Sequence, residues 1–156
     1  MASNTFITID GVEGEYKDGA IEVLEWRWGA ANQGTTHDGG SGPAQVNLHV
    51  GNLEFRKPVD MSTPTLHRIC VKGVPFSEAT LTVTKSAEEP IPYLKLKMSE
   101  GVVVSVQGGG PGNTSLYEWV ELNFPKFEFE YEKQGADASG VGGDAFKYDI
   151  PNRAEL

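Results

Sequence analysis

The sequence has 156 residues, enough for one domain (residues 1–156) with an apolar core of its own. The formal net charge is −9. This excludes the classes that bind nucleic acid or insert into anionic membranes, because both need basic patches. A single cysteine, Cys70, excludes an internal disulfide. No apolar run approaches the roughly 20 residues of a membrane span.

The first residues carry neither a basic nor an apolar leader region, so we expect no cleaved signal peptide. Together with the lone cysteine, this predicts folding in a reducing cytoplasm.

Alternation of apolar and polar residues, typical of half-buried strands, dominates the chain. It predicts strands at 6–9 and 21–28. In the second strand, alternate residues form two faces: Leu24, Trp26 and Trp28 on one, and Val23, Glu25 and Arg27 on the other. A further strand around Val46–Val50 reaches Gly51-Asn52, where the apolar phase slips by one residue. This slip indicates a bulge or a tight bend.

One helix is expected within residues 58–73. Ser62 or Thr63 is predicted to cap its start. Leu66, Ile69 and Cys70 form one apolar stripe. Gly73 ends the helix.

Strand patterns resume over 80–84, 93–98, 102–106, 119–133 and 146–150. In residues 102–106 a run of valines indicates a more deeply buried strand. Many short strands, Gly/Pro turns and one helix indicate an antiparallel sandwich or barrel.

No constellation predicts catalysis. His37, His49 and His67 lack the spacing of a metal site. Cys70 lies on the apolar stripe, where thiols pack rather than react. The glycine-rich segment 108–112 lacks the Gly-Lys-Ser/Thr ending of a phosphate loop. We therefore expect no catalytic residue, no metal and no cofactor.

Two features have alternative interpretations. Glu128, Glu130 and Glu132 share one strand face; this face is either solvated and paired with lysines across the sheet, or a calcium site if more oxygens converge there. Trp26 and Trp28 are either core residues or a stacking platform for a sugar.

Three segments, taken in order, resemble the Hcp (hemolysin-coregulated protein) family, which forms the tube of bacterial type VI secretion machines. The resemblance spans essentially the whole chain. The segments are Phe6 to Trp26-x-Trp28-Gly29, Asp60-Met61-Ser62-Thr63-Pro64-x-Leu66 to Gly73, and Val120-x-Leu122-x-Phe124 to Tyr148-x-Ile150-x-Asn152.

The resemblance implies a mainly β fold: a small antiparallel β-barrel of two sheets with one short helix at its side. It implies a structural protein, not an enzyme, that assembles into homohexameric rings with a central channel. The rings stack into a tube, carry or chaperone effectors, and meet spike and sheath proteins. The protein would be cytoplasmic before firing and then secreted through the machine.

The resemblance also assigns roles to particular residues. The polar strand face with Glu25 and Arg27 would line the channel. Arg27 stands where the family often has a small residue, and six copies would form a ring of guanidinium groups. Such a ring favours acidic over cationic cargo, but the cargo preference stays open. The arm that contacts the neighbouring ring comprises Gln33, Gly34, Thr35, Thr36, His37, Asp38, Gly39, Gly40 and Ser41.

Two alternative functions stay open at this point. One is a tube subunit of another contractile injection particle or phage tail. The other is a monomeric β-barrel enzyme or ligand-binding protein that uses the Trp26/Trp28 face.

Overall fold

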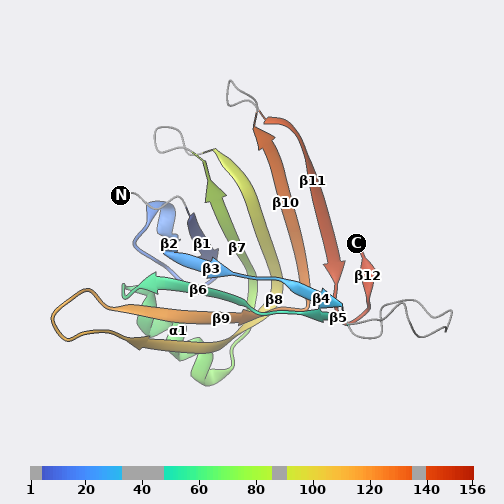
Figure 1. Cartoon of the computed structure of the whole chain (residues 1–156). Helices are drawn as coiled ribbons and strands as arrows, with labels where there is room; N and C mark the ends of the chain where they lie inside the picture. Colours follow the sequence, from blue (N-terminus) through green and yellow to red (C-terminus); the bar gives the residue numbers. More distant parts are fainter. Residues whose placement is uncertain (1–4, 33–47, 86–90, 135–139) are drawn as a thin grey trace.

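A computed structural model describes residues 5–32, 48–85, 91–134 and 140–156 (Figure 1). Strands dominate these residues. In chain order the elements are β1 Thr5–Ile9, a 3-10 turn Lys17–Gly19, β2 Ile21–Glu22, β3 Glu25–Arg27, β4 Ala30–Asn32, β5 Leu48–Val50, β6 Leu53–Pro58, α1 Ser62–Lys72, β7 Phe76–Thr84, β8 Pro92–Gly109, β9 Tyr117–Asn123, β10 Lys126–Gln134, β11 Gly140–Asp149 and β12 Ala154–Glu155.

The strands form two antiparallel sheets that share β8. The first sheet has the order β12-β11-β10-β8-β7-β1-β2, and the second has the order β3-β6-β9-β8. In Figure 1 the strands of the second sheet cross those of the first at a wide angle, with α1 beneath β9. The expected mainly β fold of two sheets with one helix is confirmed.

The strand pairing does not close into a complete barrel. It is open between β2 and β3, where the chain itself passes from one sheet to the other. The Val23 N–H donates to the Thr5 carbonyl (3.1 Å), and the Leu24 N–H donates to the Arg56 carbonyl (2.8 Å). These two bonds tie the crossing segment to both sheets.

This crossing also corrects the predicted faces of residues 21–28. Val23 is buried and Leu24 is exposed, whereas Trp26 and Trp28 pack partly against the core. The prediction that Leu24 shares a face with the tryptophans is therefore wrong. Because the chain changes sheet at this point, the strand alternation restarts.

A bend within β8 lets one strand belong to both sheets. Its first half pairs with β7 and β10, and residues from Val102 onward pair with β9. Glu100, between the halves, has a φ of 58°. A Cβ on Gly101 would lie 2.6 Å from the Asn123 carbonyl oxygen. Among the valines after this bend, only Val103 is buried. The prediction that residues 102–106 form a more deeply buried strand is therefore wrong.

The core lies between the two sheets. Alternate residues of both sheets point into it, as the sequence pattern predicts. It includes Ile7, Ile21, Leu53, Phe55, Leu66, Leu81, Leu96, Met98, Val120 and Leu122.

The helix confirms its predicted stripe and its end. Leu66 is fully buried, and Gly73 closes the helix in the left-handed region (φ 65°). The predicted start needs correction, because Asp60 performs the capping. Its carboxylate accepts the Ser62 N–H (2.9 Å), and its carbonyl accepts the Thr63 N–H (3.1 Å). No helix within the described residues is long and apolar enough to cross a membrane.

Candidate functional site

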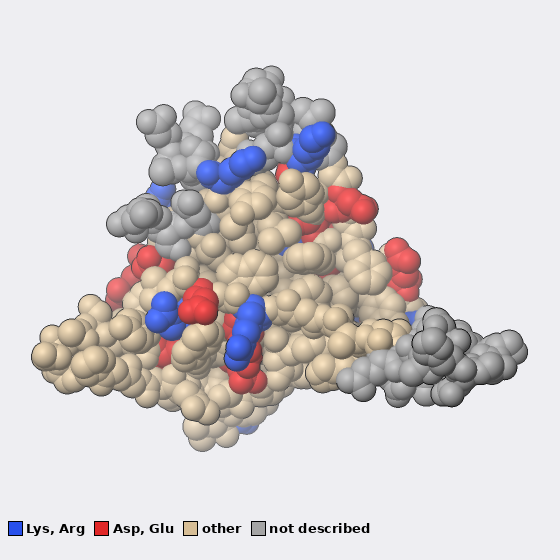
Figure 2. All heavy atoms as spheres, viewed as in Figure 1, with Lys and Arg blue, Asp and Glu red and all other residues tan. Residues whose placement is uncertain are grey.

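The outward face of the second sheet carries ionised side chains on three neighbouring strands. In Figure 2, blue and red side chains are interspersed over the region of β3, β6 and β9. The strand register places Arg27 beside Glu54 and Glu121 in one row, and Glu25 beside Arg56 in the next. We call this set of five residues the charged face. It brings together Glu25 and Arg27, the two residues singled out from the sequence.

The charges on this face are largely paired with each other. Arg27 donates a hydrogen bond to Glu54, and Glu25 lies 3.6 Å from Arg56. The bond to Glu54 raises the pKa of Arg27. The same bond lowers the pKa of Glu54. The Arg27 guanidinium is thus paired with a carboxylate of its own chain, a partner that the sequence pattern does not indicate.

Aromatic rings support both guanidinium groups. Arg27 lies 5.9 Å from the ring centroid of Trp119, and Arg56 lies 5.1 Å from that of Tyr117. Both rings are more than a third exposed. Such contacts are favourable because the ring face is electron-rich.

Two hollows flank the row of Arg27, Glu54 and Glu121. One, of about 240 Å³, is completed by Ser105, Gln107 and Trp119. The other, of about 450 Å³, extends toward Gly29, Gly51 and Asn52.

A separate hairpin projects from the second sheet. Strands β4 and β5 pair only with each other within the described residues. Ala30 and Asn32 are exposed, and so is His49. The hairpin leads into the predicted arm, Gln33 to Ser41, which lies outside the described residues, as does His37.

Both tryptophans are partly buried and pack against the core. Trp28 packs against Phe124, Phe127 and Phe129, with ring centroids 5.0 to 6.3 Å away. Its indole N–H donates to the Gly51 carbonyl (3.0 Å). The core interpretation is confirmed, and with Trp28 packed on several sides the sugar platform loses its basis.

Glu128, in the acidic alternation on β10, is paired with a lysine as the simpler interpretation predicts. Glu128 lies opposite both Lys97 and Lys147, with Lys147 Nζ at 3.6 Å. No group of three or more potential metal ligands occurs among the described residues.

A buried ion cluster ties α1 to the second sheet. Lys57 is fully buried and bonds the equally buried Glu118. Its ammonium also lies 3.1 Å from Asp60, 2.9 Å from the Pro58 carbonyl and 3.3 Å from the Thr63 hydroxyl. Thr63 donates to Glu118 as well (2.7 Å). The sequence pattern does not indicate this cluster, since Lys57 and Glu118 are 61 residues apart. They come together only because they lie opposite each other on β6 and β9.

His67 extends this cluster to the surface. Its Nε2 lies 3.6 Å from Glu118 Oε2, a buried oxygen with no hydrogen-bond partner among the described residues. Lys57 and Glu118 are both fully buried and bonded to each other, so the cluster joins α1 to the second sheet.

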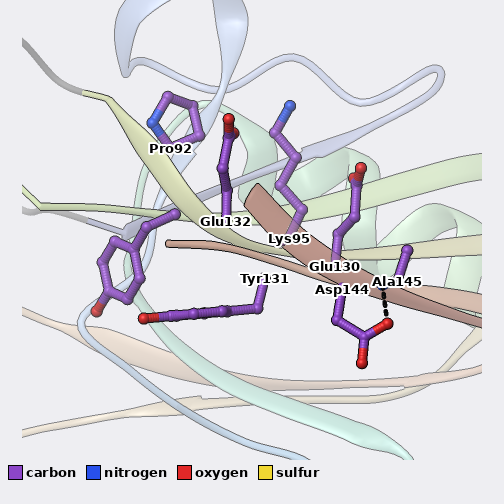
Figure 3. A pocket seen from close by; sticks show the side chains of 9 residues that line it. Pro92, Lys95, Glu130, Tyr131, Glu132, Asp144 and Ala145 are labelled. Atoms are coloured by element: carbon purple, nitrogen blue, oxygen red, sulfur yellow. Dashed lines mark hydrogen bonds between the residues drawn. The ribbon is translucent and has the colours of Figure 1, made fainter. Parts of the chain in front are cut away.

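A hollow at the far end of the first sheet does not gather a reactive set (Figure 3). Tyr93 and Tyr131 meet edge to face, with ring centroids 6.3 Å apart. Lys95 and Glu130 project to one side of the sheet, whereas Tyr131 projects to the other. The hollow therefore does not bring Tyr131 together with Lys95 and Glu130.

Comparisons with known proteins converge on one family. A family model described as "Type VI secretion system effector, Hcp" matches residues 6–131. Protein hcp1 of Pseudomonas aeruginosa is 40% identical over 149 residues, covering 92% of this chain and 91% of its own length. The crystal structure of Hcp1 from Salmonella typhimurium has a TM-score of 0.81 at 31% identity, with full coverage of both chains. The structure of a type six secretion system protein has a TM-score of 0.89 at 24% identity, covering 99% of this chain and 100% of its own, and shares the fold.

Proposed function

The chain belongs to the Hcp family of type VI secretion proteins and is a subunit of the secretion tube, and from this premise we propose that six copies close into a ring and that rings stack. The protein assembles without a reaction of its own. It is made in the cytoplasm, loads effectors, and leaves through the machine in contact with spike and sheath proteins.

The free edges of the second sheet carry the proposal. Among the described strands, β3 pairs only with β6, and the second half of β8 pairs only with β9. The four strands alternate in direction, so rotation about an axis brings β8 of one copy antiparallel to β3 of the next. Unpaired edges favour such pairing, and a rotation that closes gives a ring.

Exposed apolar side chains lie on two different flanks. Tyr131 and Phe146 are half-exposed on β10 and β11. Val59 and Leu116 are similarly exposed and meet through a Val59 N–H to Leu116 carbonyl bond (3.0 Å). β11 and the start of β9 lie on opposite sides of the molecule (Figure 1). Two unlike patches favour a head-to-tail contact rather than a two-fold dimer.

The ring gives roles to the charged face and the arm. With the second sheet toward the axis, Glu25 and Arg27 line the channel. The β4–β5 hairpin carries Gln33 to Ser41 to the neighbouring ring.

Negative-stain microscopy of the purified chain tests both parts. We expect six-fold rings, and stacks of rings at high concentration. Replacing residues 34–40 by a short Gly-Ser link should leave rings that do not stack. Gly112→Ala, at an exposed turn position with open space around it, is the control and should behave as the parent. Particles without six-fold symmetry would contradict the ring, and stacking by the shortened variant would contradict the role of the arm.

A further inference from the structure

The charged face has one carboxylate more than its cations can balance. Its three carboxylates, on Glu25, Glu54 and Glu121, face two guanidinium groups, on Arg27 and Arg56. Each guanidinium already has a carboxylate partner. Glu121 is held by Asn52, whose amide donates to it (3.3 Å), and no ion pair joins it to a cation among the described residues. Each copy therefore presents one unbalanced negative charge here.

The hollow beside Glu121 combines this charge with an aromatic wall. Trp119 forms that wall, and Ser105 and Gln107 add neutral hydrogen-bonding groups. At about 240 Å³ the hollow is smaller than the range of small-molecule pockets. It suits one long side chain whose stem lies along an indole and whose tip is a cation.

An anion is disfavoured in the same place. Glu54 already accepts the Nε–H of Arg27, so an incoming carboxylate that uses the other N–H groups of this guanidinium would lie close to Glu54. It would also lie beside Glu121, and like charges in contact repel. The pairing of Arg27 thus reverses the preference for acidic cargo that Arg27 alone suggested.

We infer that this face binds lysine or arginine side chains of the protein carried in the channel. Glu121 is the counter-charge, and Trp119, whose ring already lies against Arg27, is an apolar wall for the stem of the incoming side chain. The inference rests on the proposed function, since it takes the second sheet to line the channel. A ring repeats the site around the axis, so that several weak contacts act on one extended cargo segment.

Fluorescence anisotropy with three labelled twelve-residue peptides tests the inference. Each peptide has a Gly-Ser background with three lysines, three glutamates or neither. We expect the lysine peptide to bind at least about fivefold more tightly than the other two, and high salt to weaken it. Glu121→Gln should abolish that preference. Glu130→Gln, an exposed carboxylate outside the charged face, is the matched control and should retain it.

Native mass measurement of the same samples separates this inference from the ring. The site lies within one chain, so the peptide preference is measurable whether or not rings form. Absence of a six-copy species would overturn the proposed function alone. Equal or tighter binding of the glutamate peptide, or an unchanged lysine preference in Glu121→Gln, would overturn the cation site.

Discussion

Removing the cation from the buried cluster should destabilise the chain more than any surface change. The Lys57→Met substitution replaces the aliphatic part of the lysine with another apolar side chain and removes the ammonium. Glu118 then stays buried without its charge partner, and Asp60, itself largely buried, loses its contact at 3.1 Å. The variant therefore measures the cost of a buried carboxylate without its charge partner, together with the loss of the bonds to Pro58 and Thr63.

The expected magnitude follows from burial. Breaking a buried ion pair by removing one partner costs about 3–5 kcal/mol. For a domain of this size each kcal/mol lowers Tm by roughly 2–4 °C. We therefore expect a loss of about 6–20 °C. The double variant Lys57→Met/Glu118→Gln should recover much of this loss, because no unpaired Glu118 charge remains and the amide oxygen can still accept the Thr63 hydroxyl.

Thermal and urea unfolding at one fixed protomer concentration provide the assay, because assembly itself adds stability. Lys97→Met is the matched control. Lys97 pairs with Glu78 at 3.6 Å, but both side chains are nearly half exposed, so its loss should stay below about 1 kcal/mol. A loss below about 1 kcal/mol for Lys57→Met, or a double variant no more stable than the single one, would refute the reasoning.

Three further predictions follow from local contacts. Gly101→Ala should cost about 1–3 kcal/mol because its Cβ meets backbone and ring atoms, whereas Gly109→Ala enters open space and should change little; equal losses in urea unfolding would contradict this. Trp28→Phe should cost about 1–3 kcal/mol by leaving a carbonyl without its donor, and an unchanged Tm would count against the packing described. The Asn152 amide donates to Asp149 (2.9 Å) and holds the pKa of Asp149 below its usual value. The stability difference between the parent and Asn152→Ala should thus be full at neutral pH and shrink below about pH 4, as Asp149 is protonated; a gap that widens in acid would contradict it.

Local patterns predicted most of the fold. The alternation on Phe127, Phe129 and Tyr131 and the glycine at the end of α1 depend on neighbours in the chain, so sequence reveals them. The change of sheet at Val23–Leu24 and the bend at Glu100 depend on how distant strands cross. No local sequence pattern indicates where those strands cross.

The candidate site was likewise predictable only in part. Glu25 and Arg27 alternate on one short strand, and their shared face was predictable. Their partners Glu54 and Arg56 come from β6, which only the strand register brings alongside. For that reason the sequence pattern points to Arg27 but not to the carboxylate that pairs with it.

Native mass spectrometry of the purified chain tests the central claim most directly. A closed head-to-tail ring predicts one dominant species of six copies at micromolar concentration. That species should persist at high salt, because apolar flanks and strand edges carry the contact. A spectrum dominated by the monomer, or an open series of increasing copy number without a sixfold end point, would contradict the account.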